Sequence, residues 1–258
     1  MRTHIFHIAD IHIHAHNYAH IAHAWRELIA NIIAHPDYKK TIILAIVGDI
    51  FDHKMWLQAD DITLFKNMLN DLESNEIRTI MMPGNHDYNI NQGGHDCKNT
   101  SDKVLAIVRG SNYKFITHCS LSQICLIDNL AFFIHSPIDL GTPRPGPEHA
   151  QIKKIAMVHE PLTNSKTGSG ITFQSQRFAA KDFAPVFDIT LLGDIHHPQK
   201  LAPNVAYSGS FVQKNRGEGI EHGYFLWDVA TCASRFIELP QLSLYLKLSA
   251  KNNIEPAL

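Results

Sequence analysis

Five short clusters of polar residues stand directly behind apolar runs of the sequence, and their side chains are of the kinds that bind divalent metals. The first is Asp10-Ile11-His12, in which a carboxylate and an imidazole are two residues apart. In an extended segment, residues i and i+2 point to the same side, so the two side chains could bind one metal ion together. This spacing is common by chance, and its weight comes from the clusters that follow it.

The second cluster, Gly48-Asp49-Ile50-Phe51-Asp52, follows the apolar run IILAIV. A carboxylate at the end of a buried strand is costly unless it is paired or bound to a metal. Asp49 could therefore bridge two ions with its two oxygens, while Asp52 would contact the ligand residues and not the ions themselves. The alternative is a turn followed by a helix cap, because aspartate suits both.

The third cluster, Gly84-Asn85-His86-Asp87, follows the residues Met81-Met82-Pro83. Asn85 offers a neutral oxygen ligand, and His86 is placed to contact a substrate oxygen instead of a metal. An ordinary turn is the alternative here. The cluster follows another apolar run, so it should lie at the same edge of the sheet as the first two clusters. This position favours a role in the metal site over an ordinary turn.

The last two clusters are His159 and the segment Gly193-Asp194-Ile195-His196. A single histidine such as His159 is more often structural than a ligand. Asp194 and His196, however, repeat the i, i+2 spacing of the first cluster. The sequence therefore predicts that carboxylates and imidazoles from five places gather at one metal site.

An alternation of strands and helices is expected to position these clusters. Predicted strands and helices alternate in the first half, and short strands dominate the second half, so the later sheet should be mixed or antiparallel. In open α/β sheets, binding sites collect beyond the carboxyl ends of strands, so the clusters should meet in space. Strands are predicted at 4–9, 41–47, 78–82, 124–127, 131–134, 155–158, 189–192, 205–207, 223–229 and 234–239, and helices at 20–34 and 59–72.

The composition is that of a compact globular protein. The chain has 258 residues with 45% hydrophobic and 19% charged residues, which predicts one domain over 1–240 and a polar C-terminal tail over 241–258. The net charge of −2 provides no strong field for nucleic acid. Scattered cysteines and the lack of an apolar run of membrane-spanning length predict a soluble protein of the cytoplasm, with no membrane contact.

The order D-x-H, G-D-x-x-D, G-N-H-D, H, G-D-x-H resembles the calcineurin-like metallophosphoesterase family across residues 10–198. This resemblance implies an α/β fold in which two central β-sheets pack as a sandwich flanked by helices. The segments 196–198, 207–210 and 222–228 are similar to the SbcD-type DNA repair nucleases. The resemblance thus implies phosphodiester hydrolysis of DNA by a hydroxide that two metal ions activate, in DNA repair or recombination.

The family resemblance also implies a role for each residue. At position 194 the family usually has histidine, and an aspartate there would favour an oxygen-loving ion, so Mn²⁺ is expected ahead of Mg²⁺, Fe or Zn²⁺. The expected substrate contacts are His53, Ser208 and Ser210, and the catalytic residues are His86 and Asp52, with Asp52 orienting the His86 ring. One metal would be held by Asp10, His12, Asp49 and His196, and the other by Asp49, Asn85, His159 and Asp194.

Partners and rival functions follow from the same resemblance. DNA is the expected substrate, a coiled-coil ATPase of the SbcC type is a candidate partner, and residues 59–72 could form a homodimer contact. The capping domain of such nucleases is expected to be absent, because the chain ends soon after the core. The alternatives are a small-molecule phosphodiesterase or phosphatase, and a binding scaffold without metals. A protein phosphatase is disfavoured because His53-Lys54 stands where those enzymes have Arg-Gly.

Overall fold

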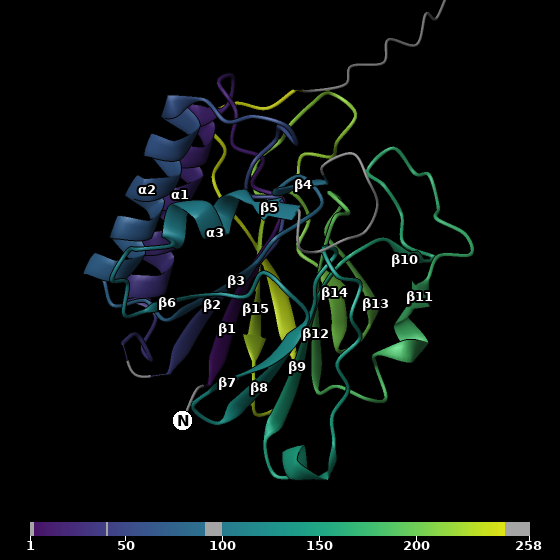
Figure 1. Ribbon diagram of the computed structural model, residues 1–258. Helices are drawn as coiled ribbons and strands as arrows, with labels where there is room; N and C mark the ends of the chain where they lie inside the picture. The colour runs from purple at the N-terminus through teal and green to yellow at the C-terminus, as the bar shows by residue number, and fades with distance from the viewer. Residues whose placement is uncertain (1–2, 40, 91–99, 246–258) are drawn as a thin grey trace, which may run out of the picture.

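The computed structural model describes residues 3–39, 41–90 and 100–245, and its core is a sandwich of two six-stranded sheets (Figure 1). In the first sheet the strand order is β16-β15-β1-β2-β3-β6, and in the second it is β13-β14-β12-β9-β8-β7. The first sheet consists of β1 (His4–Ile8), β2 (Ile42–Val47), β3 (Thr79–Met82), β6 (Ile116–His118), β15 (Gly223–Asp228) and β16 (Ser234–Glu238). The second consists of β7 (Gln123–Ile127), β8 (Leu130–His135), β9 (Lys153–His159), β12 (Ile189–Gly193), β13 (Gln199–Ala202) and β14 (Val205–Tyr207).

Both sheets are mixed. In the first, β1, β2, β3 and β6 run parallel, and β15 and β16 add an antiparallel edge. In the second, β8, β9, β12 and β14 run parallel between the antiparallel strands β7 and β13. The two predictions, an α/β sandwich and a mixed later sheet, are therefore confirmed.

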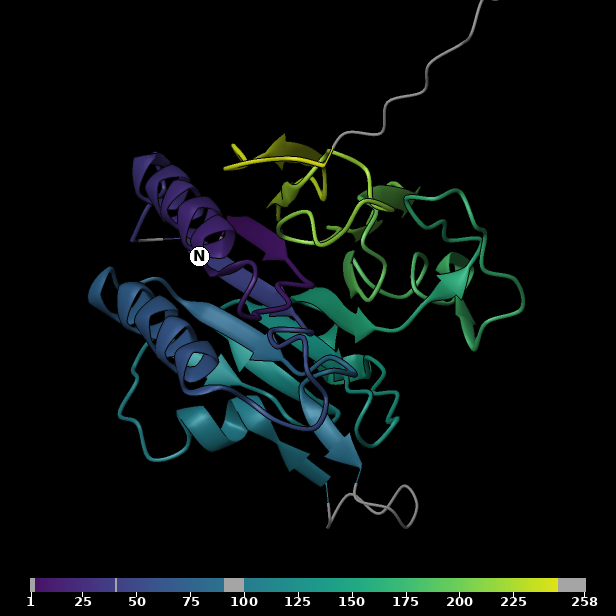
Figure 2. The same ribbon diagram turned by 90° about the horizontal axis from the view of Figure 1, so that it is seen from above.

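The helices lie on the outer face of the first sheet (Figure 2). Helix α1 (Tyr18–Ala34) buries a stripe that includes Ile21, Trp25, Leu28 and Ile32, which is the spacing of an amphipathic helix. Helices α2 (Ala59–Ser74) and α3 (Lys103–Val108) cover the rest of this face. Within the described ranges no helix is both long and apolar enough to cross a membrane.

The run IILAIV shows why strand β2 reads as continuously apolar. Ile42, Leu44 and Ile46 belong to the core under the helices, whereas Ile43, Ala45 and Val47 face the second sheet. Because both faces of this strand are covered, every residue in it is buried.

The outer face of the second sheet is covered mainly by aromatic side chains. Phe183 and Phe187 pack there with Phe133 and Tyr207 in a separate core cluster. Phe183 and Phe187 come from the segment that follows β10 (Leu162–Thr163) and β11 (Phe178–Ala179). This segment begins with the 3-10 turn Ala180–Asp182. Large aromatic side chains thus bury this face without a long helix.

The remaining strands form a small hairpin, β4 (Tyr88–Ile90) and β5 (Thr100–Asp102), and the 3-10 turn Pro147–His149 precedes β9. Of the predicted tail 241–258, residues 246–258 lie outside the described residues. Before them, the backbone of Tyr245 exchanges hydrogen bonds with the side chain of Gln213. The start of the tail therefore contacts the loop after β14.

Candidate metal centre

Three parallel strands of the first sheet deliver the first ligands. Asp10, Asp49 and Asn85 lie in the loops that follow β1, β2 and β3, and these strands are neighbours. Because the carboxyl ends of neighbouring parallel strands share one edge, the three side chains lie together. The Asp10 backbone N–H donates to the Gly48 carbonyl at 3.0 Å, which joins the first two loops.

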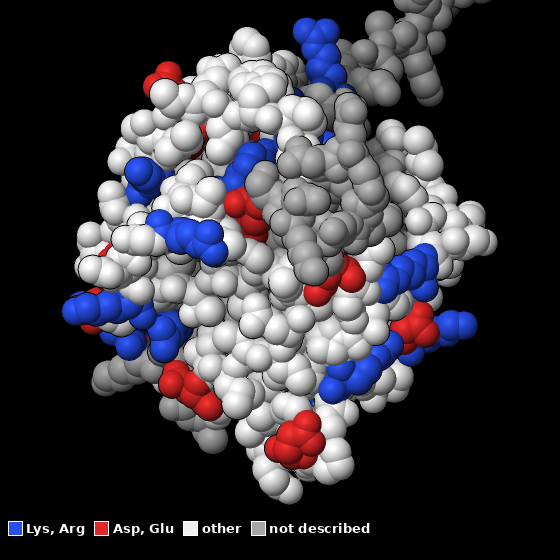
Figure 3. All heavy atoms as spheres, in the orientation of Figure 1, with Lys and Arg blue, Asp and Glu red and all other residues white. Residues whose placement is uncertain are grey.

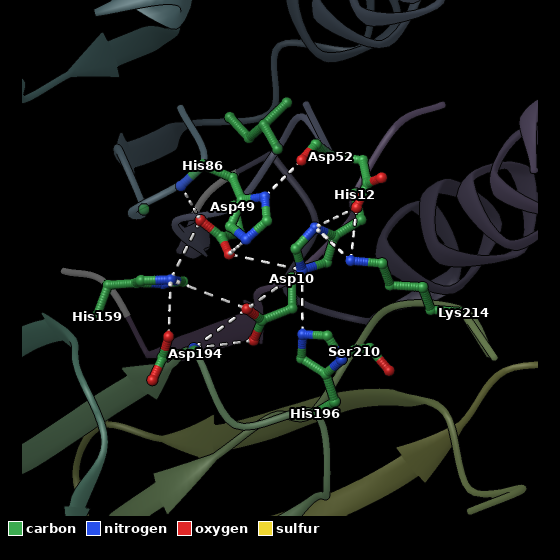
Figure 4. A network of polar contacts seen from close by, with 12 residues as sticks. Asp10, His12, Asp49, Asp52, His86, His159, Asp194, His196, Ser210 and Lys214 are labelled. Atoms are coloured by element: carbon green, nitrogen blue, oxygen red, sulfur yellow. Dashed lines mark hydrogen bonds and ion pairs between the residues drawn. The ribbon is translucent and has the colours of Figure 1, made fainter. Parts of the chain in front are cut away.

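The second sheet contributes the remaining ligands from two adjacent strands. His159 ends β9, and Asp194 and His196 follow β12, which pairs with β9 in parallel. The Asp194 backbone N–H donates to both oxygens of Asp10 at 3.1 Å, so the two sheets are tied together at the site. The predicted metal ligands therefore converge, as Figure 4 shows for those that it labels.

The backbone at these positions departs from the prediction of simple strand alternation. Asp10, His12, Asp49 and Asp194 all have positive φ, at 52°, 50°, 52° and 88°. The two side chains of the first cluster thus converge because of a left-handed loop beyond β1 and not because they alternate along a strand. Non-glycine residues in this conformation are uncommon and tend to concentrate at functional sites.

His12 and His196 form one half of the site. Their Nε2 atoms lie 3.0 Å apart, and each Nδ1 faces a carboxylate, Asp52 at 3.3 Å and Glu218 at 2.7 Å. A carboxylate on Nδ1 fixes the ring and directs the Nε2 lone pair outward, which is the usual arrangement of metal-binding histidines. Burial lowers the pKa of His12 to about 4, so its imidazole is neutral near pH 7, the form that binds metal.

His159 forms the other half. Its Nδ1 lies 2.8 Å from the Val47 carbonyl oxygen and donates to it, while Nε2 is buried without a hydrogen-bond partner. That Nε2 lies 3.3 Å from Asp49 Oδ1 and 3.9 Å from Asp194 Oδ1. The side-chain oxygen of Asn85 is also buried without a partner. Buried polar atoms without a partner call for an explanation, and for His159 Nε2, which lies close to carboxylates, a bound cation provides one.

Asp10 and Asp49 lie between the two halves. Asp10 Oδ1 is 4.0 Å from the Nε2 atoms of both His12 and His159, and Asp49 reaches the same two rings with different oxygens, at 3.5 Å and 3.3 Å. The sequence predicts that Asp49 alone bridges two ions. In the structure both Asp10 and Asp49 lie close enough to His12 and to His159 to contact an ion at either ring.

The electrostatics of this cluster favour a bound cation. Burial raises the pKa of Asp10 to about 7. Burial also opposes the charge on His159, but the carboxylates of Asp49, Asp10 and Asp194 together outweigh it and raise the pKa of the ring. The negative charge that holds a proton there would equally attract a divalent ion. The donor set of carboxylate oxygens, imidazole nitrogens and one amide oxygen fits such an ion well.

Asp52 and His86 lie at the edge of the cluster, but they contact each other differently from the prediction. His86 Nδ1 contacts the backbone carbonyl of Asp52, and its Nε2 lies 4.0 Å from Asp49 Oδ2. The Asp52 carboxylate faces His12 instead and lies 2.5 Å from Lys214 Nζ. Burial opposes ionisation of Asp52, but its hydrogen bonds to these two groups outweigh burial and lower its pKa.

Asp87 supports the loops from beneath. Its buried carboxylate accepts hydrogen bonds from the backbone N–H groups of Ile50, Phe51 and Gly84, at 3.1, 2.9 and 2.9 Å. Gly84 must lack a side chain, since a Cβ there would lie 2.1 Å from an oxygen of Asp49. The G-N-H-D cluster therefore combines ligand, substrate-facing and structural residues.

The predicted substrate contacts are separated by the structure. His53 lies at the rim directly after Asp52, whereas Ser208 and Ser210 are fully buried. The Ser210 hydroxyl donates to Glu218 at 3.2 Å, and the Ser208 hydroxyl donates to the Gly209 carbonyl at 3.4 Å. The two serines thus lie behind the site and not on its surface, which departs from the expectation of direct contact with a substrate.

Two residues that sequence reasoning missed are Lys214 and Glu218. They lie in the loop between β14 and β15, where a lysine and a glutamate read as ordinary solvated residues. Beside His196 and Glu218, the site opens into a cavity of about 520 Å³. The segment 167–169 and Phe173 line its other wall. This volume is typical of a small-molecule pocket.

Comparison with known proteins identifies the family. Residues 3–198 match the Calcineurin-like phosphoesterase family, and the chain belongs to it. Members of this family typically bind divalent metals, in keeping with the clustered donors described above. This is a family of phosphoesterases, and the described residues include the kinds of donor that its metal sites need.

One relative is an uncharacterized protein, R555, of Acanthamoeba polyphaga mimivirus, which is 31% identical over 254 residues. The alignment covers 91% of this chain but only 18% of that protein, so the chain spans about a fifth of its relative's length. A solved structure, TT1561 of Thermus thermophilus, superposes with a TM-score of 0.51 at 12% identity. It covers 92% of this chain and 99% of its own, and at this identity the likeness concerns the fold.

Proposed function

We propose that this chain hydrolyses phosphodiester bonds in DNA, in the manner of the SbcD-type nucleases, with two divalent ions held by the cluster. The observation that carries the proposal is that Asp10 and Asp49 each lie within 4.0 Å of both His12 and His159, the rings of the two halves of the site. Carboxylates shared in this way suit a pair of ions better than one. When bound, such ions would polarise a phosphoryl oxygen and lower the pKa of a water molecule.

The remaining residues would hold the substrate and assist the leaving group. The Asp52 carbonyl orients the His86 ring, and Nε2 then points toward the cluster while a quarter of the side chain is exposed. His86 would thus contact the phosphoryl group, or in its imidazolium form donate the Nε2 proton to the leaving oxygen and become neutral. Lys214 lies beside both groups, 2.5 Å from Asp52 Oδ1 and 3.3 Å from His12 Nδ1, and would keep the Asp52 carboxylate ionised and in place.

The composition of the ligand set supports Mn²⁺. Asp10, Asp49, Asp194 and Asn85 supply oxygen donors, and Asp194 stands where the resemblance predicts histidine. Oxygen-rich sites favour harder ions such as Mn²⁺ or Mg²⁺ over Zn²⁺. We therefore expect Mn²⁺ to give the highest activity.

DNA must be bound by local groups, because the net charge is −2. On the face drawn in Figure 3, the basic and acidic side chains are interspersed and form no continuous basic surface. The support for DNA is the SbcD-like sequence of segments 207–210 and 222–228. A second candidate, hydrolysis of a small phosphodiester, is favoured by the 520 Å³ cavity beside His196.

The test uses metal-stripped protein resupplied with Mn²⁺, Mg²⁺ or Zn²⁺. End-labelled single- and double-stranded DNA and bis-p-nitrophenyl phosphate are the substrates. The proposal predicts Mn²⁺-dependent DNA cleavage that His86→Ala reduces by about a hundredfold or more. His23→Ala on α1, outside the cluster, is the matched control and should keep full activity.

The outcomes separate the candidates. Cleavage of the small ester with intact DNA would favour the small-molecule phosphodiesterase. The absence of turnover with every metal would contradict both enzymatic candidates and favour a binding scaffold. Equal losses in His86→Ala and His23→Ala would contradict the role given to His86.

A further inference from the structure

The loop between β2 and α2 exposes two large apolar side chains next to the metal centre. Met55 is 70% exposed and Trp56 is 48% exposed. Trp25 and Trp227, the other two tryptophans of the chain, are 2% and 0% exposed. Exposed tryptophan at the rim of a site often serves in binding, because the indole offers a large flat surface at little entropic cost.

Trp56 is held flat by its neighbour His53. The two rings stack with centroids 3.9 Å apart and planes inclined by 22°. One face of the indole is thereby covered, which agrees with an exposure of about half the side chain. The exposed half of the side chain offers surface to a second planar ring.

The loop is anchored at both ends. The Lys103 ammonium contacts the backbone carbonyl of His53, and Leu57 packs against the core beneath the helices. An anchored aromatic pair loses little conformational freedom when a ligand stacks on it, so it is preorganised for binding.

The stacked pair adjoins the predicted reaction centre. His53 follows Asp52, whose carboxylate lies 3.3 Å from His12 Nδ1, and His12 in turn faces His196. Figure 4 shows Asp52 and His196 on opposite sides of the cluster. The aromatic pair therefore follows directly after one residue of the cluster in the chain, and the 520 Å³ cavity adjoins another, His196. Lys54 within the loop is exposed and adds a positive charge beside the aromatic pair.

We infer that Trp56, supported by His53, is a stacking site for a nucleobase adjacent to the phosphodiester that the metal centre cleaves. The inference rests on the proposed function and specifies its substrate as a strand with unpaired bases, since a base inside a duplex cannot stack on a side chain. Stacking tolerates every base, so the site selects for unpaired nucleic acid and not for a sequence.

Intrinsic fluorescence tests the inference without turnover. Metal-free protein is titrated with oligothymidylate and with an abasic oligonucleotide of the same length. We expect oligothymidylate to quench the emission, because Trp56 is the exposed tryptophan, and the abasic strand to quench it far less. Trp56→Leu should lose this quenching.

Affinity measured with a labelled oligothymidylate provides the second readout. Trp56→Leu should bind about tenfold more weakly, and Trp56→Phe, which keeps a stacking ring, should retain most of the affinity. Both variants should bind the abasic strand as the wild type does. Unchanged thermal midpoints would show that the variants are folded, as expected for a half-exposed position.

Several results would overturn the inference. Equal quenching by the abasic strand, or equal affinity of Trp56→Leu for oligothymidylate, would exclude base stacking. A dimer that Trp56→Leu abolishes, without any nucleotide effect, would assign the loop to contact between copies of the chain. DNA cleavage that proceeds with an unchanged KM in Trp56→Leu would leave the proposed function intact while rejecting the stacking site.

Discussion

At the scale of single residues, the site depends on groups that hold the histidines as much as on the histidines themselves. Glu218 holds His196, Asp52 holds His12 and the Val47 carbonyl holds His159, in each case through Nδ1. All three rings therefore present Nε2 to the cluster. Such supporting partners raise the basicity of the ligand and fix its tautomer.

Glu218→Gln tests this support. Glutamine keeps the size of the side chain and one acceptor oxygen but removes the charge that faces His196 Nδ1 at 2.7 Å. We expect the affinity for Mn²⁺ to fall by about 10- to 100-fold. Calorimetric titration measures this change, and Glu221→Gln, an exposed glutamate of the same loop, should bind as the wild type does. Equal affinity in Glu218→Gln would contradict the supporting role.

The ligands could be predicted from the sequence because each lies in a short contiguous cluster behind an apolar run. Lys214 and Glu218 could not, since their roles depend on a loop that folds back over the end of another sheet. The contact between His86 and Asp52 was predicted, but through the wrong atoms. Only the folded loop shows that the backbone carbonyl of Asp52, and not its carboxylate, meets the ring.

At the scale of elements, strands and helices with a strong periodic pattern were predicted closely, whereas several of the short elements were missed. Helix α1 and strand β2 have enough apolar residues in register to be found without tertiary information. Helix α3 has six residues and strand β6 has three, and elements of this length depend on contacts made elsewhere in the fold. The positive φ angles of Asp10 and His12 have no signature in the sequence.

Asp102 illustrates how such short elements are held. Its carboxylate accepts hydrogen bonds from the Leu105 backbone N–H at 2.9 Å, from His118 at 2.6 Å and from the Ser120 hydroxyl at 2.5 Å. It therefore caps α3 and joins it to β6. Burial opposes ionisation of this group, but its hydrogen bonds from His118 and Ser120 outweigh burial and lower its pKa.

Asp102→Asn should make stability depend less on pH. A carboxyl group with a lowered pKa in the folded state stabilises the protein above its unfolded pKa, near 3.8, and this contribution is lost as the pH falls through the folded value. We expect a deficit of about 2 kcal/mol at pH 7 that shrinks below pH 3.8. Urea unfolding from pH 7 to pH 3 measures it, with the exposed Glu238→Gln as control. A deficit that does not vary with pH would contradict this assignment.

At the scale of the whole molecule, two sheets meet so that their loops share one metal centre, and the first sheet combines strands from both ends of the described chain. The fold class could be predicted because the order of the five clusters is specific to the family. The covering of the second sheet could not, since Phe183 and Phe187 act through packing and not through periodicity. Partnership with a coiled-coil ATPase and dimer formation through α2 remain predictions, and the much longer viral relative leaves room for further domains in proteins of this kind.

The most direct test of the metal centre is a calorimetric titration of the metal-stripped protein with Mn²⁺. The proposed function predicts two ions per chain for the wild type, and Asp49→Asn should lose high-affinity binding of both because its two oxygens face His12 and His159. His23→Ala should bind as the wild type does. The absence of binding in the wild type, or the same stoichiometry and affinity in Asp49→Asn, would contradict the assignment of this cluster as a two-metal centre.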